Sequence, residues 1–321
     1  MKHPVTITVC AILAALVLWL FLALWPEWLV AAIGPKKIFV NTIFNGVTLA
    51  GLYFLVASGF TLVFGLMRNV NLAHGSLYLL GAYLGYSVIQ WTGSWYLGVA
   101  AGFLGMALVG LALQLLVFRH MEGQDMRQTM VTIGISIVLA DIMLWIWSGN
   151  TYQFEAPEIL SGVAHVPLVR VYPAYRLVVL AVAIVIGVGL SLFLNKTPIG
   201  MMIRAGVDDR AMLSATGVNV HLIFAVTFAI GAGLAGFAGV VGGTALSIAP
   251  GEDIRYLLAS LVVTIVGGMG SITGAAIGAL LIGLAEQFGL AYSPTYGVVY
   301  TFVIMVVVLA FRPQGIMGRR A

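Results

Sequence analysis

The chain has 321 residues, of which 61% are hydrophobic and 8% charged, and its mean hydropathy is +1.08. With 15 Lys and Arg and 11 Asp and Glu it has too few charges to cover the surface of a soluble domain of this length, so the composition excludes that class. The net charge of +4 comes from bases scattered at the ends of apolar runs, which is typical of membrane loops and not of a nucleic-acid-binding surface.

The first predicted element is an apolar run over residues 5–25, preceded by Lys2 and His3. It resembles a signal peptide, but it is longer than the usual signal-peptide core and no small-residue cleavage site follows it. We therefore expect a retained first membrane span. The single cysteine, Cys10, lies in this run, so the chain cannot form an internal disulfide or a cysteine-based metal site.

Nine further apolar runs follow, and most approach the roughly 20 residues that a transmembrane helix needs. Backbone groups in lipid must be satisfied internally, and no alternating pattern indicates a barrel, so the runs are predicted to be helices. The sequence thus predicts an all-α polytopic membrane protein, a single domain over residues 1–321 with about ten membrane helices. The further runs are 38–66, 72–90, 95–117, 129–148, 176–194, 220–246, 254–267, 273–291 and 295–311.

The hydrophilic joints between the runs predict the orientation of the chain. Three joints are flanked by basic residues and are predicted to be cytoplasmic. These are residues 118–128, 196–218 and 312–321. The joint over residues 149–175 has three prolines and its bases are matched by acids, so it is predicted to be an extracytoplasmic loop. Counting crossings between these joints gives ten, with Lys36 and Lys37 as the one exception to the charge rule.

A glycine-rich break divides the apolar stretch 254–291. Gly267, Gly268 and Gly270 interrupt this stretch, and the parity of crossings requires it to cross an even number of times. Two short helices that meet at a glycine bend satisfy both conditions. A polar bend at residues 72–76 has a similar place in the first half, so an inverted repeat of two halves is a further hypothesis.

The most charged segment, within residues 196–210, must lie in water between two spans. Thr197 can cap a helix whose first residue is Pro198, and Gly217 can end it. The predicted helix, residues 198–216, has flexible methionines on an apolar side that would suit a partner surface. Its alternative is an ordinary solvated loop. The candidate partner-contact residues are Arg204, Gly206, Asp208, Asp209 and Arg210, with Arg204 paired to Asp208 and Gly206 allowing close backbone approach.

Several separated stretches resemble, in the same order, the motifs of the branched-chain amino acid ABC transporter permeases. They are residues 53–78, 197–205, 211–217, 266–278 and 311–318. The chain looks most like the first of the two permeases of that family, the one without extra soluble extensions. The chain has no G-x-x-x-x-G-K-[ST] phosphate loop, so ATP hydrolysis is expected on another chain.

The resemblance implies a permease subunit of a bacterial ABC importer in the cytoplasmic (inner) membrane, which moves branched-chain or other hydrophobic amino acids by ATP-driven alternating access. It also implies that residues 198–216 are the coupling helix. The implied partners are a second related permease, two ATP-binding subunits that hold ATP and Mg²⁺, an extracytoplasmic solute-binding protein and membrane lipid. No cofactor, metal or enzymatic activity is expected of this chain itself. Urea, short amides and aromatic acids, which relatives handle, are the alternative substrates.

Polar residues within spans are candidates for the substrate path, because they usually face the bundle interior or a water-filled route. The densest group is Asn45, Thr48, Ser58, Thr61, Asn71, His74 and Ser76. Two smaller groups are Thr132, Ser136 and Asp141, and Glu286 with Gln287. Hydrogen bonding within or between helices is the competing interpretation for most Ser and Thr residues, and it is favoured for His74.

Two rival functions are weighed against the importer. A stand-alone secondary transporter or channel would need buried charge, for which Asp141 and Glu286 are the candidates. A membrane enzyme is disfavoured because no nucleophile and base are arranged for catalysis and no cluster has metal-ligand spacing. Trp145 and Trp147 are interpreted as part of an interfacial aromatic belt.

Overall fold

The computed structural model describes residues 35–67, 70–121, 123–166 and 169–318. The predicted first span and Cys10 lie outside these residues. The described chain is almost wholly helical, so the predicted all-α polytopic fold is confirmed. Its longer helices are α3 (Lys36–Met67), α4 (His74–Thr92), α5 (Trp95–Leu116), α6 (Asp125–Trp147), α7 (Ala174–Lys196), α8 (Pro198–Asp208), α10 (Val220–Ala245), α11 (Glu252–Gly267), α12 (Ile272–Tyr292) and α13 (Gly297–Phe311).

The remaining described elements are short. They are α9 (Arg210–Ala215), the 3-10 turns Phe118–Met121, Glu158–Leu160 and Pro294–Tyr296, and an antiparallel hairpin of β1 (Val163–Val166) and β2 (Val169–Pro173). Six described helices are long and apolar enough to cross a membrane, namely α3, α5, α6, α7, α10 and α12. Since α4, α11 and α13 are shorter or less apolar, the predicted number of ten spans is approximate.

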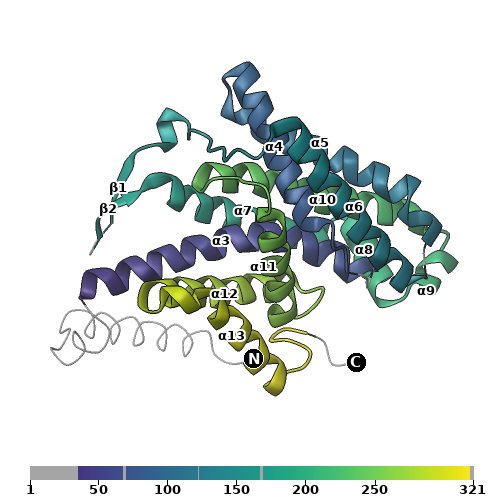
Figure 1. Cartoon of the computed structure of the whole chain (residues 1–321). Helices are drawn as coiled ribbons and strands as arrows, with labels where there is room; N and C mark the ends of the chain where they lie inside the picture. The colour runs from purple at the N-terminus through teal and green to yellow at the C-terminus, as the bar shows by residue number, and fades with distance from the viewer. Residues whose placement is uncertain (1–34, 68–69, 122, 167–168, 319–321) are drawn as a thin grey trace.

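Helices α3 and α10 form the centre of the bundle (Figure 1). In the most apolar 18 residues of each helix, 83% of the residues of α3 and 78% of those of α10 are buried. The corresponding shares for α5, α6 and α7 lie between 11% and 22%, so these helices form the periphery. Glycines let the central helices approach through their backbones. A Cβ atom at Gly59 of α3 would clash with the carbonyl of Gly231 in α10, and one at Gly236 of α10 would clash with the carbonyl of Gly102 in α5.

The predicted glycine break is confirmed. Helix α11 ends at Gly267 and α12 begins at Ile272, and Gly268 and Gly270 have φ angles of 108° and 79°, which only glycine adopts readily. Ser271 caps α12 by accepting a hydrogen bond of 3.0 Å from the backbone N–H of Gly274. Backbone hydrogen bonds from Ile316 and Met317 to the end of α11 fold the C-terminal tail against this bend. The inverted repeat stays a prediction.

The bundle has two ends, which we name by their neighbours. At the hairpin end, β2 packs on the first turns of α3, and the preceding loop pairs Tyr152 with Ile248 beyond the end of α10. At the α8 end, α8 and α9 connect the last turn of α7 to the first turn of α10. Residues 149–175 thus lie at one end and residues 198–216 at the other.

Candidate functional site

A small polar cavity lies at the hairpin end of the bundle, and we call it the hairpin-end cavity. It has a volume of about 120 Å³ and is bordered by the first half of α3, the start of α7, the end of α10 and the last turns of α12. Its lining residues are Asn45, Thr48, Leu49, Leu52, Arg176, Val179, Ala245, Leu246 and Gln287. Three of the predicted path residues, Asn45, Thr48 and Gln287, therefore meet here.

Arg176 is the charged residue of the hairpin-end cavity. Its Nη1 donates a hydrogen bond of 2.6 Å to Oδ1 of Asn45, and its guanidinium lies 6.0 Å from the ring centre of Tyr172. Because a guanidinium can only donate, this contact fixes which end of the Asn45 amide faces it. The Asn45 nitrogen then remains as a donor. Among the described residues, no carboxylate contacts Arg176.

Tyr172 of β2 holds the hairpin over the cavity. Its ring is buried with Val40, Phe44 and Leu177, and its hydroxyl lies 2.9 Å from Oγ1 of Thr48 and 3.2 Å from Oδ1 of Asn45. The Thr48 hydroxyl also lies 2.9 Å from the carbonyl of Phe44, so two hydroxyl protons are shared among three contacts. The loop between α6 and α7 is thereby tied to two residues that line the cavity, Thr48 and Asn45, which sequence reasoning did not foresee.

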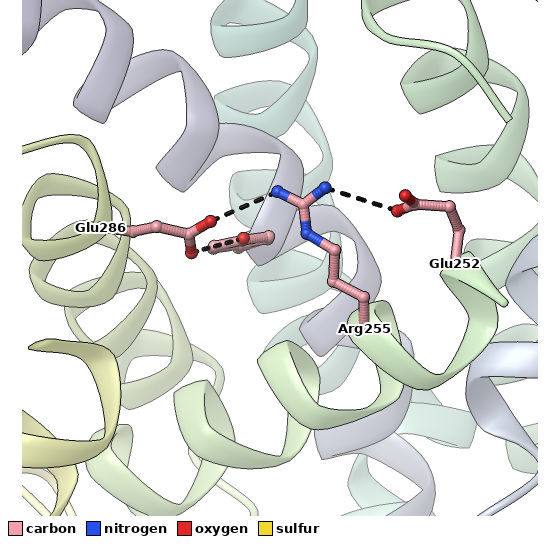
Figure 2. Close-up of polar contacts among 4 residues, drawn as sticks. Glu252, Arg255 and Glu286 are labelled. Carbon is pink, nitrogen blue, oxygen red and sulfur yellow. Dashed lines mark hydrogen bonds and ion pairs between the residues drawn. The ribbon is translucent and has the colours of Figure 1, made fainter. Parts of the chain in front are cut away.

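A charged cluster lies on α3, α11 and α12, and we call it the Arg255 cluster (Figure 2). The guanidinium of Arg255 lies between two carboxylates, 3.4 Å from Glu252 and 3.3 Å from Glu286. The hydroxyl of Tyr53 donates a 2.6 Å hydrogen bond to the second oxygen of Glu286. The side chain of Glu286 is only 7% exposed, whereas that of Arg255 is 47% exposed. The cluster joins three helices around a compensated charge.

The other predicted path residues serve contacts between or within helices. Thr61 of α3 lies 2.9 Å from Thr264 of α11, and Ser58 donates to the carbonyl of Leu55 in its own helix. Asn71 accepts a hydrogen bond from the backbone of Ala73 just before α4. These three side chains are buried and line no cavity identified at the hairpin end.

His74 and Ser76 tie the start of α4 to its neighbours. Nε2 of the buried His74 lies 3.0 Å from the carbonyl of Val56, so the geometry agrees with the structural interpretation of this histidine. Ser76 lies 2.8 Å from Ser136 of α6 and donates to Asp253 of α11. A role of either residue in transport stays a prediction.

The second predicted group divides in the same way. Thr132 accepts a hydrogen bond from the backbone of Leu72, and Asp141 is exposed on α6. Trp145 is 86% exposed, as an interfacial residue would be, but Trp147 stacks on Tyr83 and donates to Ser87. Trp147 is therefore partly a packing residue.

The charged segment between α7 and α10 has the predicted start. Thr197 accepts a 3.0 Å hydrogen bond from the backbone of Gly200, and Pro198 is the first helical residue. The sequence predicts one helix to Thr216, whereas the structure has two. Asp209 has an extended backbone and caps α9 by accepting from the N–H of Met212 at 2.9 Å. An aspartate that caps a second helix explains the interruption.

The two faces of α8 differ in what they contact. Ile203 and Gly206 are buried against the bundle, whereas Ile199, Met201 and Arg204 are exposed. Arg204 donates to Asn195 of α7 at 2.7 Å, and the role of Gly206 in a partner contact stays a prediction. Asp209 is exposed. The side chains of Asp208 and Arg210 lie outside the described part, so the predicted pair of Arg204 and Asp208 stays a prediction.

These features define a multi-pass membrane protein with a polar cavity at one end and an amphipathic segment at the other. The chain belongs to the family described as the permease component of the branched-chain amino acid transport system, whose model matches residues 42–309. The resemblance found in the sequence is thereby confirmed.

Curated relatives agree with this family. The chain is 31% identical over 298 residues to the high-affinity branched-chain amino acid transport system permease protein LivH of Salmonella typhimurium, covering 88% of this chain and 96% of the relative. It is 30% identical over 297 residues to the permease protein BraD of Pseudomonas aeruginosa, with the same coverage. The permease protein LivM of Escherichia coli is 24% identical over 303 residues, covering 84% of this chain and 68% of the relative. No solved structure matches the chain.

Sequence reasoning missed four residues of these sites. Tyr172 lies in the predicted loop and Arg176 at the start of the next apolar run, and neither was singled out. Glu252 and Arg255 lie at the start of the apolar run that begins at residue 254, and they were not singled out either. An arginine inside an apolar run is a signal that could have identified Arg255, because a charge in a span needs a partner. No comparable signal marks Tyr172.

Proposed function

We propose that this chain is the membrane-spanning permease subunit of a bacterial ABC importer for branched-chain amino acids. The observation that carries the proposal is the family membership, with relatives of nearly equal length that are named as permeases of branched-chain amino acid systems. Its weaker similarity to LivM supports a second, related permease as the other half of the membrane unit. The inner membrane is the expected location.

The α8 end supports attachment of an ATP-binding subunit. Ile199 and Met201 of α8 and Met212 of α9 are 42%, 49% and 67% exposed, although they lie next to charged residues in a segment that leaves the bundle. Apolar side chains beside charges suit a protein surface more than lipid or water alone. Two ATP-binding subunits would supply ATP and Mg²⁺, and this chain would hydrolyse nothing itself.

The structure offers a mechanical path for the coupling. The buried face of α8 packs in one cluster with residues of α3, α7 and α10, among them Leu62, Leu190 and Phe224. A displacement of α8 by an ATP-binding subunit would therefore move the two central helices, since packed cores transmit strain instead of absorbing it. Movement of these helices would open the path alternately to the two sides of the membrane, with the hairpin end outside.

Reconstitution tests the function. Proteoliposomes should contain this chain, the second permease and the ATP-binding subunits, with ATP inside and a solute-binding protein outside. We expect uphill uptake of radiolabelled L-leucine that requires ATP, and none by this chain alone. Leucine accumulation by the isolated chain under an ion gradient would instead support a secondary transporter. Competition by excess urea, acetamide or benzoate distinguishes the alternative substrates, none of which should reduce leucine uptake.

A matched pair of variants tests the coupling. Met201→Glu places a charge on the exposed face of α8, where Met201 is 49% exposed. Met317→Glu is the control, because Met317 of the C-terminal tail is 48% exposed. Only Met201→Glu should reduce co-purification of the ATP-binding subunits and leucine-stimulated ATPase activity. If both variants behave alike in co-purification and ATPase activity, α8 does not bind the ATP-binding subunits. Topology is tested, after removal of Cys10, by single cysteines at Gln124 and Ser161, which should react with impermeant reagents from opposite sides.

The rival of an ion-coupled transporter lacks support from the described residues. Its candidates were Asp141, which is exposed, and Glu286, which is engaged by Tyr53 and Arg255. A coupling carboxylate should lie buried and free to exchange its ion. Neither residue meets that condition.

A further inference from the structure

The hairpin-end cavity contains a half-buried cation whose neighbours in the described part of the chain are neutral. Arg176 uses one N–H on the Asn45 carbonyl oxygen, and no described carboxylate contacts it. Removing a guanidinium partly from water is costly unless an anion compensates it. The remaining N–H groups of Arg176 are therefore available to an anion that enters the cavity.

Two amide groups beside Arg176 offer further donors. The nitrogen of Asn45 is left free when its oxygen accepts from Arg176, and the carboxamide of Gln287 makes no hydrogen bond with another described residue. A guanidinium with amide donors is the usual arrangement for a planar carboxylate. The oxygen of Gln287 could accept from an ammonium group of the same ligand.

Apart from Thr48, the rest of the lining is aliphatic. Leu49, Leu52, Val179 and Leu246 line the cavity beside the polar groups. Its volume is about 120 Å³, which is ample for several water molecules or a small ligand. That space suits a carboxylate group with an aliphatic neighbour.

We propose that Arg176, Asn45 and Gln287 form an entry subsite that binds the carboxylate of an aliphatic α-amino acid. The inference rests on the proposed function, because it takes the transported amino acid as the ligand and the hairpin end as the outside. Arg176 binds the carboxylate, Asn45 orients the guanidinium, and the Tyr172 hydroxyl holds Asn45 and Thr48 in place. Arg255 cannot serve in this way, because two carboxylates already compensate its charge.

Asn45→Asp is the most informative variant. It supplies a carboxylate at the atom that Arg176 already contacts, so the charge is compensated in place with almost no change of shape. Arg176→Gln removes the charge, and Lys37→Gln is the matched control because it removes an exposed charge from the same end of α3. Co-purification of all subunits and basal ATPase activity establish that each variant is assembled.

Binding is measured on the nucleotide-free complex in phosphatidylcholine nanodiscs, without solute-binding protein, using tritiated L-leucine. We expect Asn45→Asp and Arg176→Gln to weaken leucine binding about tenfold or more, and Lys37→Gln to leave it unchanged. On the unmodified complex, 4-methylpentanoate should displace leucine, and leucinamide, which lacks the carboxylate, should not.

Several results would overturn the subsite. Wild-type leucine affinity in Asn45→Asp would do so, as would equal displacement by leucinamide. If phosphatidylglycerol in the nanodiscs displaces leucine and Asn45→Asp alters only that effect, the occupant is a lipid phosphate. An unmodified complex that takes up leucine with its solute-binding protein yet binds none without it would refute the subsite and leave the proposed function intact. Failure of that uptake would instead refute the function.

Discussion

Two arginines of the helical bundle, Arg176 and Arg255, differ in how their charge is compensated. Arg255 lies between Glu252 and Glu286, so its charge is compensated within the chain. Arg176 contacts a neutral amide and an aromatic ring and lines an open cavity. The difference indicates that Arg255 holds α11 and α12 together, whereas Arg176 is available to a ligand. A compensated arginine should affect stability, and an uncompensated one should affect binding.

The largest expected effect is on the structural side of this comparison. Glu286→Ala removes the acceptor of the buried Tyr53 hydroxyl and one of the two anions beside Arg255. Breaking a fully buried pair costs about 3–5 kcal/mol. Because Arg255 is half exposed, we expect a loss of about 2 kcal/mol in the unfolding free energy of the complex. Denaturant titration of the purified complex measures it.

Asn45→Asp is the control for that measurement, because it changes charge at the other arginine. It should leave the unfolding free energy within about 0.5 kcal/mol of the unmodified complex. If Glu286→Ala were neutral for stability and abolished leucine binding, the assignment of the two arginines would be reversed.

The second effect is a partial rescue. Arg255→Gln combined with Glu286→Gln removes both charges and keeps groups that can hydrogen-bond with Tyr53. A neutral replacement of both partners is usually less costly than loss of one, so the double variant should recover about 1 kcal/mol relative to Glu286→Ala. The same titration checks this, with Arg255→Gln alone and Glu286→Gln alone to complete the cycle. A double variant less stable than the sum of its parts would argue against direct pairing.

The sequence predicted the scaffold better than these sites, for a physical reason. Apolar runs, the Thr197 and Pro198 start and the glycine bend are local signals, and each appeared in the structure close to its predicted place. The break at Asp209 was also local and could have been recognised as a cap. What the sequence lacked was the direction in which a polar residue faces within a helix.

The predicted path group illustrates that limit. Asn45 and Thr48 line the hairpin-end cavity, whereas Ser58 and Thr61 of the same helix bond within or between helices. All four are polar residues in one apolar helix, and only the packing of α7, α11 and α12 around it separates them. The contact of Asn45 with Arg176 joins residues 131 positions apart, so no local pattern could reveal it.

The third prediction tests whether the hairpin belongs to the subsite of Arg176. Tyr172→Phe removes the hydroxyl that contacts Thr48 and Asn45 but keeps the ring that packs on Phe44. A typical net hydrogen bond is worth about 1 kcal/mol, so leucine binding should weaken about fivefold. Thr48→Val, which removes the other partner, is the matched variant and should behave similarly. Unchanged binding in both would confine Tyr172 to packing.

The smallest expected effect comes from the second carboxylate of the Arg255 cluster. Glu252 is 30% exposed, and its contact with Arg255 is 3.4 Å long and lies within the first turn of α11. Exposed pairs of this kind are worth about 0–1 kcal/mol, and a negative charge near a helix N-terminus adds a few tenths more. Glu252→Gln should therefore lower the unfolding free energy by about 0.5 kcal/mol and leave leucine binding unchanged. Because Glu286 remains in place, the Arg255 charge stays compensated on its buried side.

A loss as large as that of Glu286→Ala would mean that the exposed carboxylate, and not the buried one, holds the arginine. In that case the contrast between a structural and a ligand-binding arginine would no longer follow from burial of the partner.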